Sequence, residues 1–292
     1  MIARRAAVAT RPVLGRSATP LDRFLRNRRA IVGGVIVLLL CAMALLAPLI
    51  APYPPDLQDM ANRFQPPSVE HWLGTDNFGR DILSRCIWAA QVSLSIGVVS
   101  VLLSIVLAVL VGAISGYYGG RIDDVLMRIT DMMLAFPTLF LLFTVVALFG
   151  NAVVVLIAVL GLTSWQVGAR VVRGEILSLK TREFVVAARS VGVPDLRLVA
   201  IHLLPNVVGV IVVGATIRVA LNILLEAGLS YLGLGVQPPI ASWGNMVADG
   251  KTVLRTAWWV TSFPGTFIFM TVMAFNLLGD GLRDAFDPRM NA

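Results

Sequence analysis

Residues 89–116 read AAQVSLSIGVVSVLLSIVLAVLVGAISG, a run of 28 residues without a single Asp, Glu, Lys or Arg. A transmembrane helix needs about 20 consecutive, mostly apolar residues. This run is long enough to cross a bilayer, and its extra length allows the helix to tilt or to extend beyond the membrane. The run therefore predicts that the chain is an integral membrane protein.

Five further apolar runs accompany this one. Together the six candidate spans are 30–51, 89–116, 129–149, 152–169, 207–227 and 258–279. Over the whole chain 57% of the residues are hydrophobic and 14% are charged, whereas soluble domains carry about 25% charged residues. A soluble core of this size cannot bury so much apolar surface, but lipid can solvate it. The sequence predicts an all-α, polytopic membrane protein with about six transmembrane helices.

The positive charges are distributed unevenly between the segments that separate these spans. If the N-terminus is cytoplasmic, 18 of the 24 Lys and Arg residues lie in cytoplasmic segments and five in external ones. An excess of Lys and Arg marks the cytoplasmic side of membrane proteins, so both termini are predicted to lie in the cytoplasm. Topology thus explains the net charge of +7, and no nucleic-acid partner is expected.

The spans divide the chain into five parts. These are a basic cytoplasmic tail (1–29), an N-terminal transmembrane helix (30–51), an external loop (52–88), a five-helix core (89–280) and a cytoplasmic tail (281–292). The first span exceeds the apolar region of about 7–15 residues in a signal peptide, so it is predicted to be a retained anchor. It contains Cys41, one of only two cysteines, and a disulfide framework is therefore not indicated.

A cytoplasmic loop at 170–206 carries the most informative motif of the core. Its second part, 183–206, reads EFVVAARSVGVPDLRLVAIHLLPN. The permissive backbone of Gly192 and the helix-breaking Pro194 predict a helix, a turn and a second helix. Asp195 is placed to cap the second helix or to complement the charge at its start. The loop is therefore predicted to be a helical hairpin.

The residues alone leave two uses of this hairpin open. The small side chains of Ala187 and Ala188 permit close approach by another protein, whereas an amphipathic hairpin can also lie on lipid headgroups. A resemblance favours the first use, because the spacing of Ala-Ala, Gly and Leu-Pro resembles the "EAA" loop of ABC importer permeases. The resemblance assigns contact with a partner ATPase to Glu183, Ala187, Ala188, Gly192, Asp195, His202, Leu204 and Pro205.

Two positions differ from the usual EAA pattern. Val186 stands where the motif normally begins with Glu, which removes one expected contact with the ATPase. His202 stands where Ile is usual, and this histidine is familiar in the peptide branch of the family. Pro205 matches the motif, and it also suits the first turn of the fifth span because a proline there sacrifices no helical hydrogen bond.

Four other segments resemble the same branch, the second or C-type permease subunit of dipeptide, oligopeptide and nickel importers. They are 73–81 in the external loop, 131–137 in the third span, 226–244 after the fifth span and 276–289 at the C-terminus. The likeness runs from about residue 24 to the end of the chain. It implies the core of a type I ABC importer, preceded by an extra N-terminal helix, in a bacterial inner membrane.

The resemblance also implies partners and a mechanism. A second homologous permease would complete the path, one or two cytoplasmic ATPase subunits would bind ATP and Mg²⁺, and an external binding protein would deliver peptides. Nickel chelates and glutathione are alternative solutes. This chain itself is expected to hold no cofactor or metal and to be a transport subunit without an ATPase site. Gly250-Lys251-Thr252 is similar to the end of a phosphate loop, but Asn245 occupies the position of the required earlier Gly.

Three polar residues recur every four positions along the fifth span. Arg218, Asn222 and Glu226 fall within an arc of about 80°, so they share one helix face. Polar side chains at this depth are expected to face protein or water rather than lipid. The stripe either meets partners on the companion permease or lines the substrate path. In the path, Arg218 would meet a peptide carboxylate and Glu226 a peptide amine.

Other functions agree less well with the sequence. An ion-coupled secondary transporter would need carboxylates at mid-membrane and inverted repeats, whereas Asp131 and Glu226 lie near the interfaces and no repeat is visible. A membrane-bound enzyme would need a catalytic cluster, which the sequence lacks. The remaining charges near the third span, Asp123, Asp124, Arg128 and Asp131, have the spacing of an ion-pair ladder along one helix.

Overall fold

The computed structural model describes residues 20–286, and within them every regular element is a helix. The helices of the first half are α1 (Pro20–Arg26), α2 (Arg28–Leu45), α3 (Ala47–Ile50), the 3₁₀ turn Met60–Asn62, α4 (Ile82–Tyr118), α5 (Gly120–Ala135) and α6 (Thr138–Phe149). Those of the second half are α7 (Val153–Leu162), α8 (Gln166–Leu179), α9 (Glu183–Ser190), α10 (Asp195–Arg197), the π-helical turn Leu198–Leu203, α11 (Leu204–Tyr231), α12 (Trp243–Gly250) and α13 (Trp259–Phe286).

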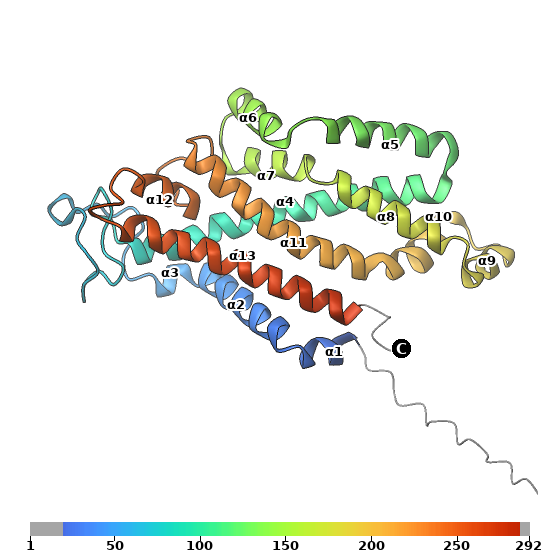
Figure 1. Cartoon of the computed structure of the whole chain (residues 1–292), viewed down its shortest axis with the longest axis horizontal. Coiled ribbons are helices and arrows are strands. Elements are labelled where there is room, and N and C mark those ends of the chain that lie inside the picture. Colours follow the sequence, from blue (N-terminus) through green and yellow to red (C-terminus); the bar gives the residue numbers. More distant parts are fainter. Residues whose placement is uncertain (1–19, 287–292) are drawn as a thin grey trace, which may run out of the picture.

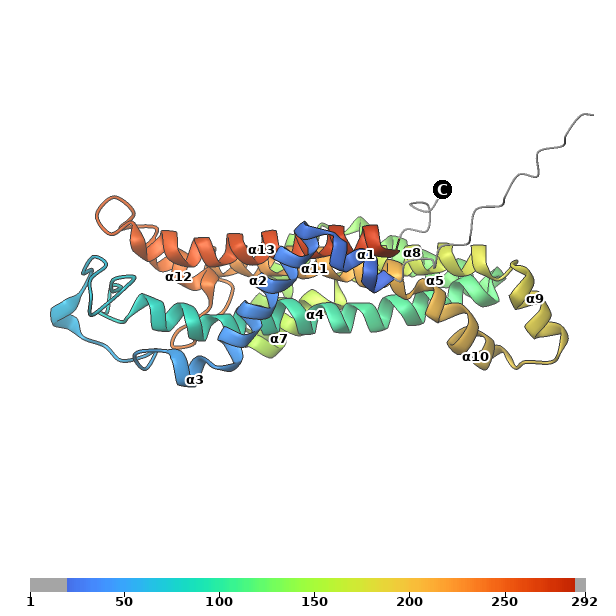
Figure 2. The same ribbon diagram turned by 90° about the horizontal axis from the view of Figure 1, so that it is seen from below.

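The long helices lie side by side along one axis of the molecule (Figure 1). At one end the hairpin of α9 and α10 projects beyond the bundle, and we refer to this as the hairpin end. At the opposite end lie α12 and the loop 51–81, which form the loop end (Figures 1 and 2). The two ends therefore correspond to the two sides of the predicted membrane protein.

The predicted number of about six spans agrees with the helices that are observed. Four helical stretches are long and apolar enough to cross a membrane: Arg28–Leu45, Ile82–Tyr118, Asp195–Tyr231 and Trp259–Phe286. Two further spans arise if each of the bent pairs α5–α6 and α7–α8 crosses once. The extra helix at the N-terminus is α2, which packs mainly against α13.

The second span is longer than its predicted range of 89–116. Asp81 caps the start of α4, because its Oδ2 accepts a hydrogen bond from the backbone N–H of Ser84 at 2.7 Å. Such a cap satisfies one of the free N–H groups at a helix start. The loop predicted at 52–88 therefore ends seven residues earlier, at Asp81, and the helix continues past Gly116 to Tyr118.

The prediction of one helix over 129–149 was wrong. The chain forms α5 and α6, which meet at an angle of 84° across Phe136 and Pro137. A proline disfavours helical geometry at the residue before it, and Phe136 accordingly has extended backbone angles. The span predicted at 152–169 is also broken, because α7 and α8 differ in direction by 40°. The first part of the predicted loop 170–206 is helical and continues α8 to Leu179.

The extra N-terminal helix is held by a close approach between small residues. A Cβ atom added to Gly281 of α13 would lie 2.0 Å from the Cβ of Ala30 on α2, which is far inside van der Waals contact. Near this contact, the Asn27 side chain at the start of α2 donates to Asp284 Oδ2 at 3.0 Å. Only glycine fits at position 281, so this packing depends on a single missing side chain.

Candidate functional site

The first helix of the hairpin, α9, ends in a Schellman motif. Gly192 has a φ angle of +81°, which glycine adopts without strain. Its N–H donates to the carbonyl of Arg189 at 3.0 Å, and the N–H of Val193 donates to the carbonyl of Ala188 at 3.2 Å. These two bonds satisfy carbonyls that would otherwise be free at the end of α9. The predicted helix, turn and helix is present, and Gly192 supplies the turn.

One face of the hairpin packs on the bundle through an apolar cluster. Val185 of α9 and the residues Leu198 and Leu203 of the π-helical turn are fully buried there. They pack against Ile176 of α8 and Tyr117 of α4. The cluster therefore joins the hairpin to α8 and α4 of the bundle.

Four apolar side chains of the hairpin are exposed. The side chains of Phe184, Val186, Val191 and Leu196 are 44%, 53%, 80% and 82% exposed, respectively. Exposed apolar side chains gathered at one place mark an interaction surface more than isolated ones do. Val186, which stands at the usual Glu position of the EAA pattern, belongs to this exposed set. We refer to these four residues as the apolar tip.

A hydrogen-bonded group ties the hairpin to the end of α4. The Tyr117 hydroxyl donates to Asp195 Oδ1 at 2.5 Å, and Arg189 Nη2 donates to the same hydroxyl at 3.3 Å. Asp195 was predicted to cap the second helix or to complement its charge. The cap residue is Pro194, and the carboxylate lies in the first turn but bonds to Tyr117. Sequence reasoning missed Tyr117, although an aromatic residue at the end of a span is typical of an interfacial anchor.

The residues assigned to ATPase contact are not equally accessible. Exposed residues are Glu183 at the start of α9, Ala187, Gly192, Asp195 and Pro205. Half-buried residues are Ala188, His202 and Leu204. Ala188 and Leu204 pack on the apolar cluster beneath the hairpin. The structure therefore brings all eight to one end of the molecule but presents only part of them to a partner.

Two of the three carboxylates of α5 pair with α8 rather than with their own helix. Arg173 Nε donates to Asp123 Oδ1 at 2.6 Å, and Arg170 forms an ion pair with Asp131. Within residues 20–286 no ion pair joins Arg128 to Asp124 or Asp131, so the predicted ladder along one helix was wrong. Because α5 packs beside α8, Asp123 and Asp131 pair with arginines of α8 instead of with Arg128 on their own helix.

The three residues of the polar stripe on the fifth span, α11, have different surroundings. Asn222 is fully buried and donates to Ser100 Oγ of α4 at 2.8 Å. Glu226 is 1% exposed, and its Oε1 accepts from Ser230 at 2.7 Å and from Ser242 at 2.9 Å. Both residues thus have partners inside this chain, whereas Arg218 is half-buried and lines a cavity. Contact of the stripe with substrate stays a prediction.

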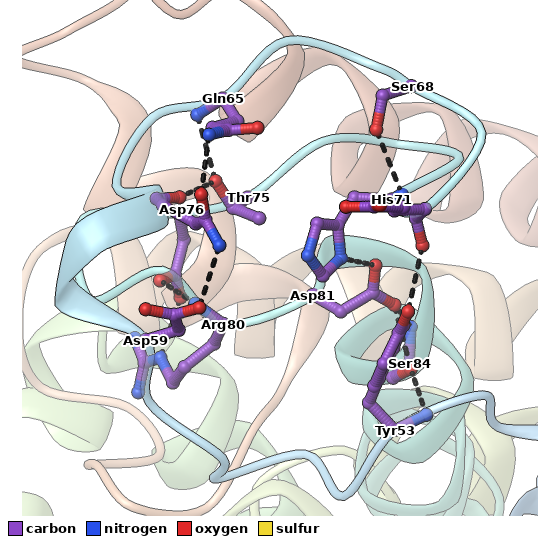
Figure 3. A network of polar contacts seen from close by, with 12 residues as sticks. Tyr53, Asp59, Gln65, Ser68, His71, Thr75, Asp76, Arg80, Asp81 and Ser84 are labelled. Atoms are coloured by element: carbon purple, nitrogen blue, oxygen red, sulfur yellow. Dashed lines mark hydrogen bonds and ion pairs between the residues drawn. The ribbon is translucent and has the colours of Figure 1, made fainter.

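A buried network of charges organises the loop end (Figure 3). Asp76 Oδ2 lies 2.7 Å from Arg80 Nε and 3.5 Å from Arg85 Nε, and all three side chains are buried. Arg80 also lies 3.7 Å from Asp249 of α12, which joins the loop 51–81 to that helix. Buried charges are tolerated when they are paired, so the network holds these segments in one arrangement.

A second part of the same loop contains the only histidine of this end. His71 Nδ1 lies 3.0 Å from Asp81 Oδ1, and Asp81 Oδ2 accepts from both the N–H and the hydroxyl of Ser84 at 2.7 Å (Figure 3). Tyr53 donates its N–H to the Ser84 hydroxyl at 3.0 Å. Among residues 20–286, no group of three His, Cys, Asp or Glu side chains is arranged to hold a metal. The bonds among Tyr53, His71, Asp81 and Ser84 link distant parts of the loop to the start of α4.

The helical bundle has a counterpart among solved structures. A chain of the methionine ABC transporter MetNI, solved in an inward-facing conformation, has the same fold with a TM-score of 0.56. The match covers 70% of this chain and 98% of that one, at 18% sequence identity. The match shows that the two chains share a fold.

The chain belongs to the family of binding-protein-dependent transport system inner membrane components, whose model matches residues 104–292. Residues 19–67 match the N-terminal transmembrane domain of oligopeptide transport permease C. The resemblance seen in the sequence is thereby confirmed, as is the fold of a permease core with an extra N-terminal helix. The chain is a multi-span permease of the bacterial inner membrane.

Curated relatives cover nearly the whole chain. The dipeptide transport system permease protein DppC of Bacillus subtilis is 40% identical over 98% of this chain and 90% of that protein. The oligopeptide transport system permease protein OppC of Bacillus subtilis is 41% identical over 92% and 88%. The glutathione transport system permease protein GsiD of Pectobacterium atrosepticum is 40% identical over 99% and 98%.

Proposed function

We propose that this chain forms half of the translocation path of an ATP-driven importer of di- or oligopeptides. The observation that carries the proposal is the near full-length similarity to DppC and OppC together with the projecting hairpin of α9 and α10. A second homologous permease completes the path. One or two cytoplasmic ATPase subunits bind ATP and Mg²⁺, and an external binding protein delivers the peptide. The chain contributes no cofactor of its own.

The hairpin transmits the motion of the ATPase. The apolar tip enters a groove on the ATPase and is held there by burial of apolar surface. Because Val186 replaces the usual Glu, this contact depends less on charge than in relatives that carry the acid. Movement of the tip then reaches α4 through Tyr117 and Asp195, and reaches α11 through the π-helical turn. Tilting of these helices alternates the side to which the path opens.

The position of the hairpin supports one orientation of the chain in the membrane. The hairpin end faces the cytoplasm, where the ATPase lies, and the loop end faces the binding protein. His71 and Lys251 are then external, whereas Arg121 and Lys180 are cytoplasmic. Lys180 Nζ donates to the carbonyl of Gly116 at 3.0 Å, so Lys180 lies beside the end of α4. Arg121 follows directly after that end, at the start of α5. Arg289, also predicted to be cytoplasmic, lies outside the described residues.

Transport by the reconstituted complex tests the proposal. The chain is purified with the second permease, the ATPases and the binding protein of its complex, and placed in liposomes. We expect ATP-dependent uptake of labelled di- and tetrapeptides that no proton or sodium gradient can replace. Uptake driven by a gradient without ATP would contradict the proposal and favour a secondary transporter.

A second candidate solute is glutathione, because GsiD is as similar to this chain as DppC. Competition distinguishes the two possibilities in the same liposomes. A tenfold excess of unlabelled glutathione is expected to leave peptide uptake unchanged. Uptake of labelled glutathione in preference to every peptide would instead assign the chain to glutathione import.

A further inference from the structure

A cavity of about 250 Å³ lies where α4, α8 and α11 pack against one another. Its walls are almost entirely apolar and include Ala108 of α4, Val171 of α8, and Val210 and Gly214 of α11. Ligand pockets are typically apolar concavities with a few well-placed polar groups, and their volumes are about 300–1,000 Å³. This cavity therefore has the character of a ligand site but has room for only one end of a peptide.

Arg218 is the only charged side chain that lines this cavity. Within residues 20–286 it makes no ion pair and no hydrogen bond. Counting about 1.5 Å per residue places it about 21 Å from Leu204 and about 20 Å from Tyr231, the two ends of α11. A guanidinium near the middle of a span is costly unless it meets an anion or water. Its position thus calls for an anionic partner from outside the chain.

Two hydroxyl groups complete the polar lining. Ser104 of α4 and Ser164, just before α8, both line the cavity, and each is 5% exposed. Within the described part of the chain neither hydroxyl has a hydrogen-bond partner, unlike Ser100, one turn before Ser104, which bonds to Asn222. One cation and two free donors inside apolar walls match the chemistry of a carboxylate attached to an aliphatic group.

We propose that this cavity binds the C-terminal carboxylate of a transported peptide and that Arg218 is its cationic partner. The inference rests on the proposed peptide import and adds a subsite to it. A lipid phosphate is a poorer match, because headgroups lie about 15 Å from the centre of the membrane. The three residues of the predicted stripe thus separate: Arg218 faces the substrate, and Asn222 and Glu226 hold α11 in place from inside.

Matched peptides test the subsite. Uptake of one tripeptide is compared with uptake of its C-terminal amide, in the complete complex, for the wild type and Arg218→Gln. A charge-assisted hydrogen bond contributes about 1.5–3 kcal/mol, so the ratio of free-acid to amide uptake is expected to fall at least about tenfold in the variant. Arg218→Lys retains the charge and is expected to keep most of the ratio. Arg255→Gln, an exposed arginine at the loop end, is the matched control and leaves the ratio unchanged.

The ratio of free-acid to amide uptake distinguishes failure of the subsite from failure of the proposed function. An equal fall for both peptides, or loss of assembly, would overturn the subsite and assign Arg218 to a carboxylate of the companion permease. An unchanged ratio would also overturn it, while leaving peptide import intact. Wild-type uptake of neither peptide would overturn the proposed function and the subsite together.

A labelling experiment gives a readout that needs no transport. Ser164→Cys is introduced into the complex after replacement of Cys41 and Cys86, and is treated with thiosulfonates of either charge. The anionic sulfonate reagent is expected to react faster than the cationic ammonium reagent, and Arg218→Gln is expected to remove this preference. A C-terminally free tripeptide should slow the reaction more than its amide does. Absence of reaction with both reagents would show that the cavity is closed to the aqueous path and would overturn the subsite.

Discussion

Substitution of Gly192 tests whether the geometry of the hairpin couples ATP hydrolysis to transport. No atom lies within 4 Å of a Cβ added at this position, so a substitution acts through the backbone alone. An L-residue held in the left-handed region costs about 1–2 kcal/mol. That cost corresponds to a roughly 5–30-fold loss in the population of the native turn in Gly192→Ala.

Two further variants grade the effect. Asn tolerates left-handed geometry better than Ala, so Gly192→Asn is expected to retain more coupling. Pro cannot adopt a φ of +81°, and it also removes the N–H that bonds to Arg189. Gly192→Pro is therefore expected to lose the Schellman motif and with it the position of the apolar tip.

The assay is peptide uptake per ATP hydrolysed by the reconstituted complex. Uptake should fall in the order Gly, Asn, Ala, Pro, while ATP hydrolysis persists because its site lies in the partner subunits. Membrane abundance of each variant is the control for insertion. Wild-type uptake by Gly192→Pro would refute the reasoning, and so would equal loss in the Asn and Ala variants.

Two more predictions concern the ends of the molecule. Tyr117→Phe removes the hydroxyl that bonds to Asp195, which weakens the link between the hairpin and α4 by about 1–2 kcal/mol. Peptide uptake per ATP hydrolysed is therefore expected to fall. Tyr118→Phe, which changes an exposed neighbour, is the control and should have no effect. The reverse outcome would remove Tyr117 from the coupling route. In a background without Cys41 and Cys86, an impermeant thiol reagent should label His71→Cys in spheroplasts but not Lys180→Cys; external labelling at position 180 would contradict the proposed orientation.

Much of the fold was predictable because membrane spans are a local property of the sequence. About twenty apolar residues in a row are stable in a bilayer whatever their neighbours do, so four of the six apolar runs lie in single long helices and the other two lie in bent helix pairs. The hairpin was predictable for a similar reason, since Gly192 and Pro194 act on their own backbone. Helix limits were less predictable, because Asp81 extends α4 by a side-chain cap and Pro137 divides the third span.

The environment of the polar stripe shows where prediction from the helical pattern stops. A helical wheel places Arg218, Asn222 and Glu226 on one face, and this geometry is set by the helix alone. The surroundings of that face change along its length. Asn222 is buried against α4, and Glu226 bonds to Ser242, the cap residue of α12, whereas Arg218 lines a cavity. The same limit applies to Asp123, whose partner Arg173 is fifty positions away.

The sequence by itself determined the class of protein, its family, its spans and the motif of the hairpin. These depend on composition, on spacing of about 20 residues and on the backbone preferences of Gly and Pro. Only the tertiary structure decided that Tyr117 holds Asp195, that Asn222 and Glu226 are internal, and that Arg218 alone faces a cavity. The physical reason is that hydrogen-bond partners and cavities arise from helices far apart in the chain, whose distances appear only when the bundle packs.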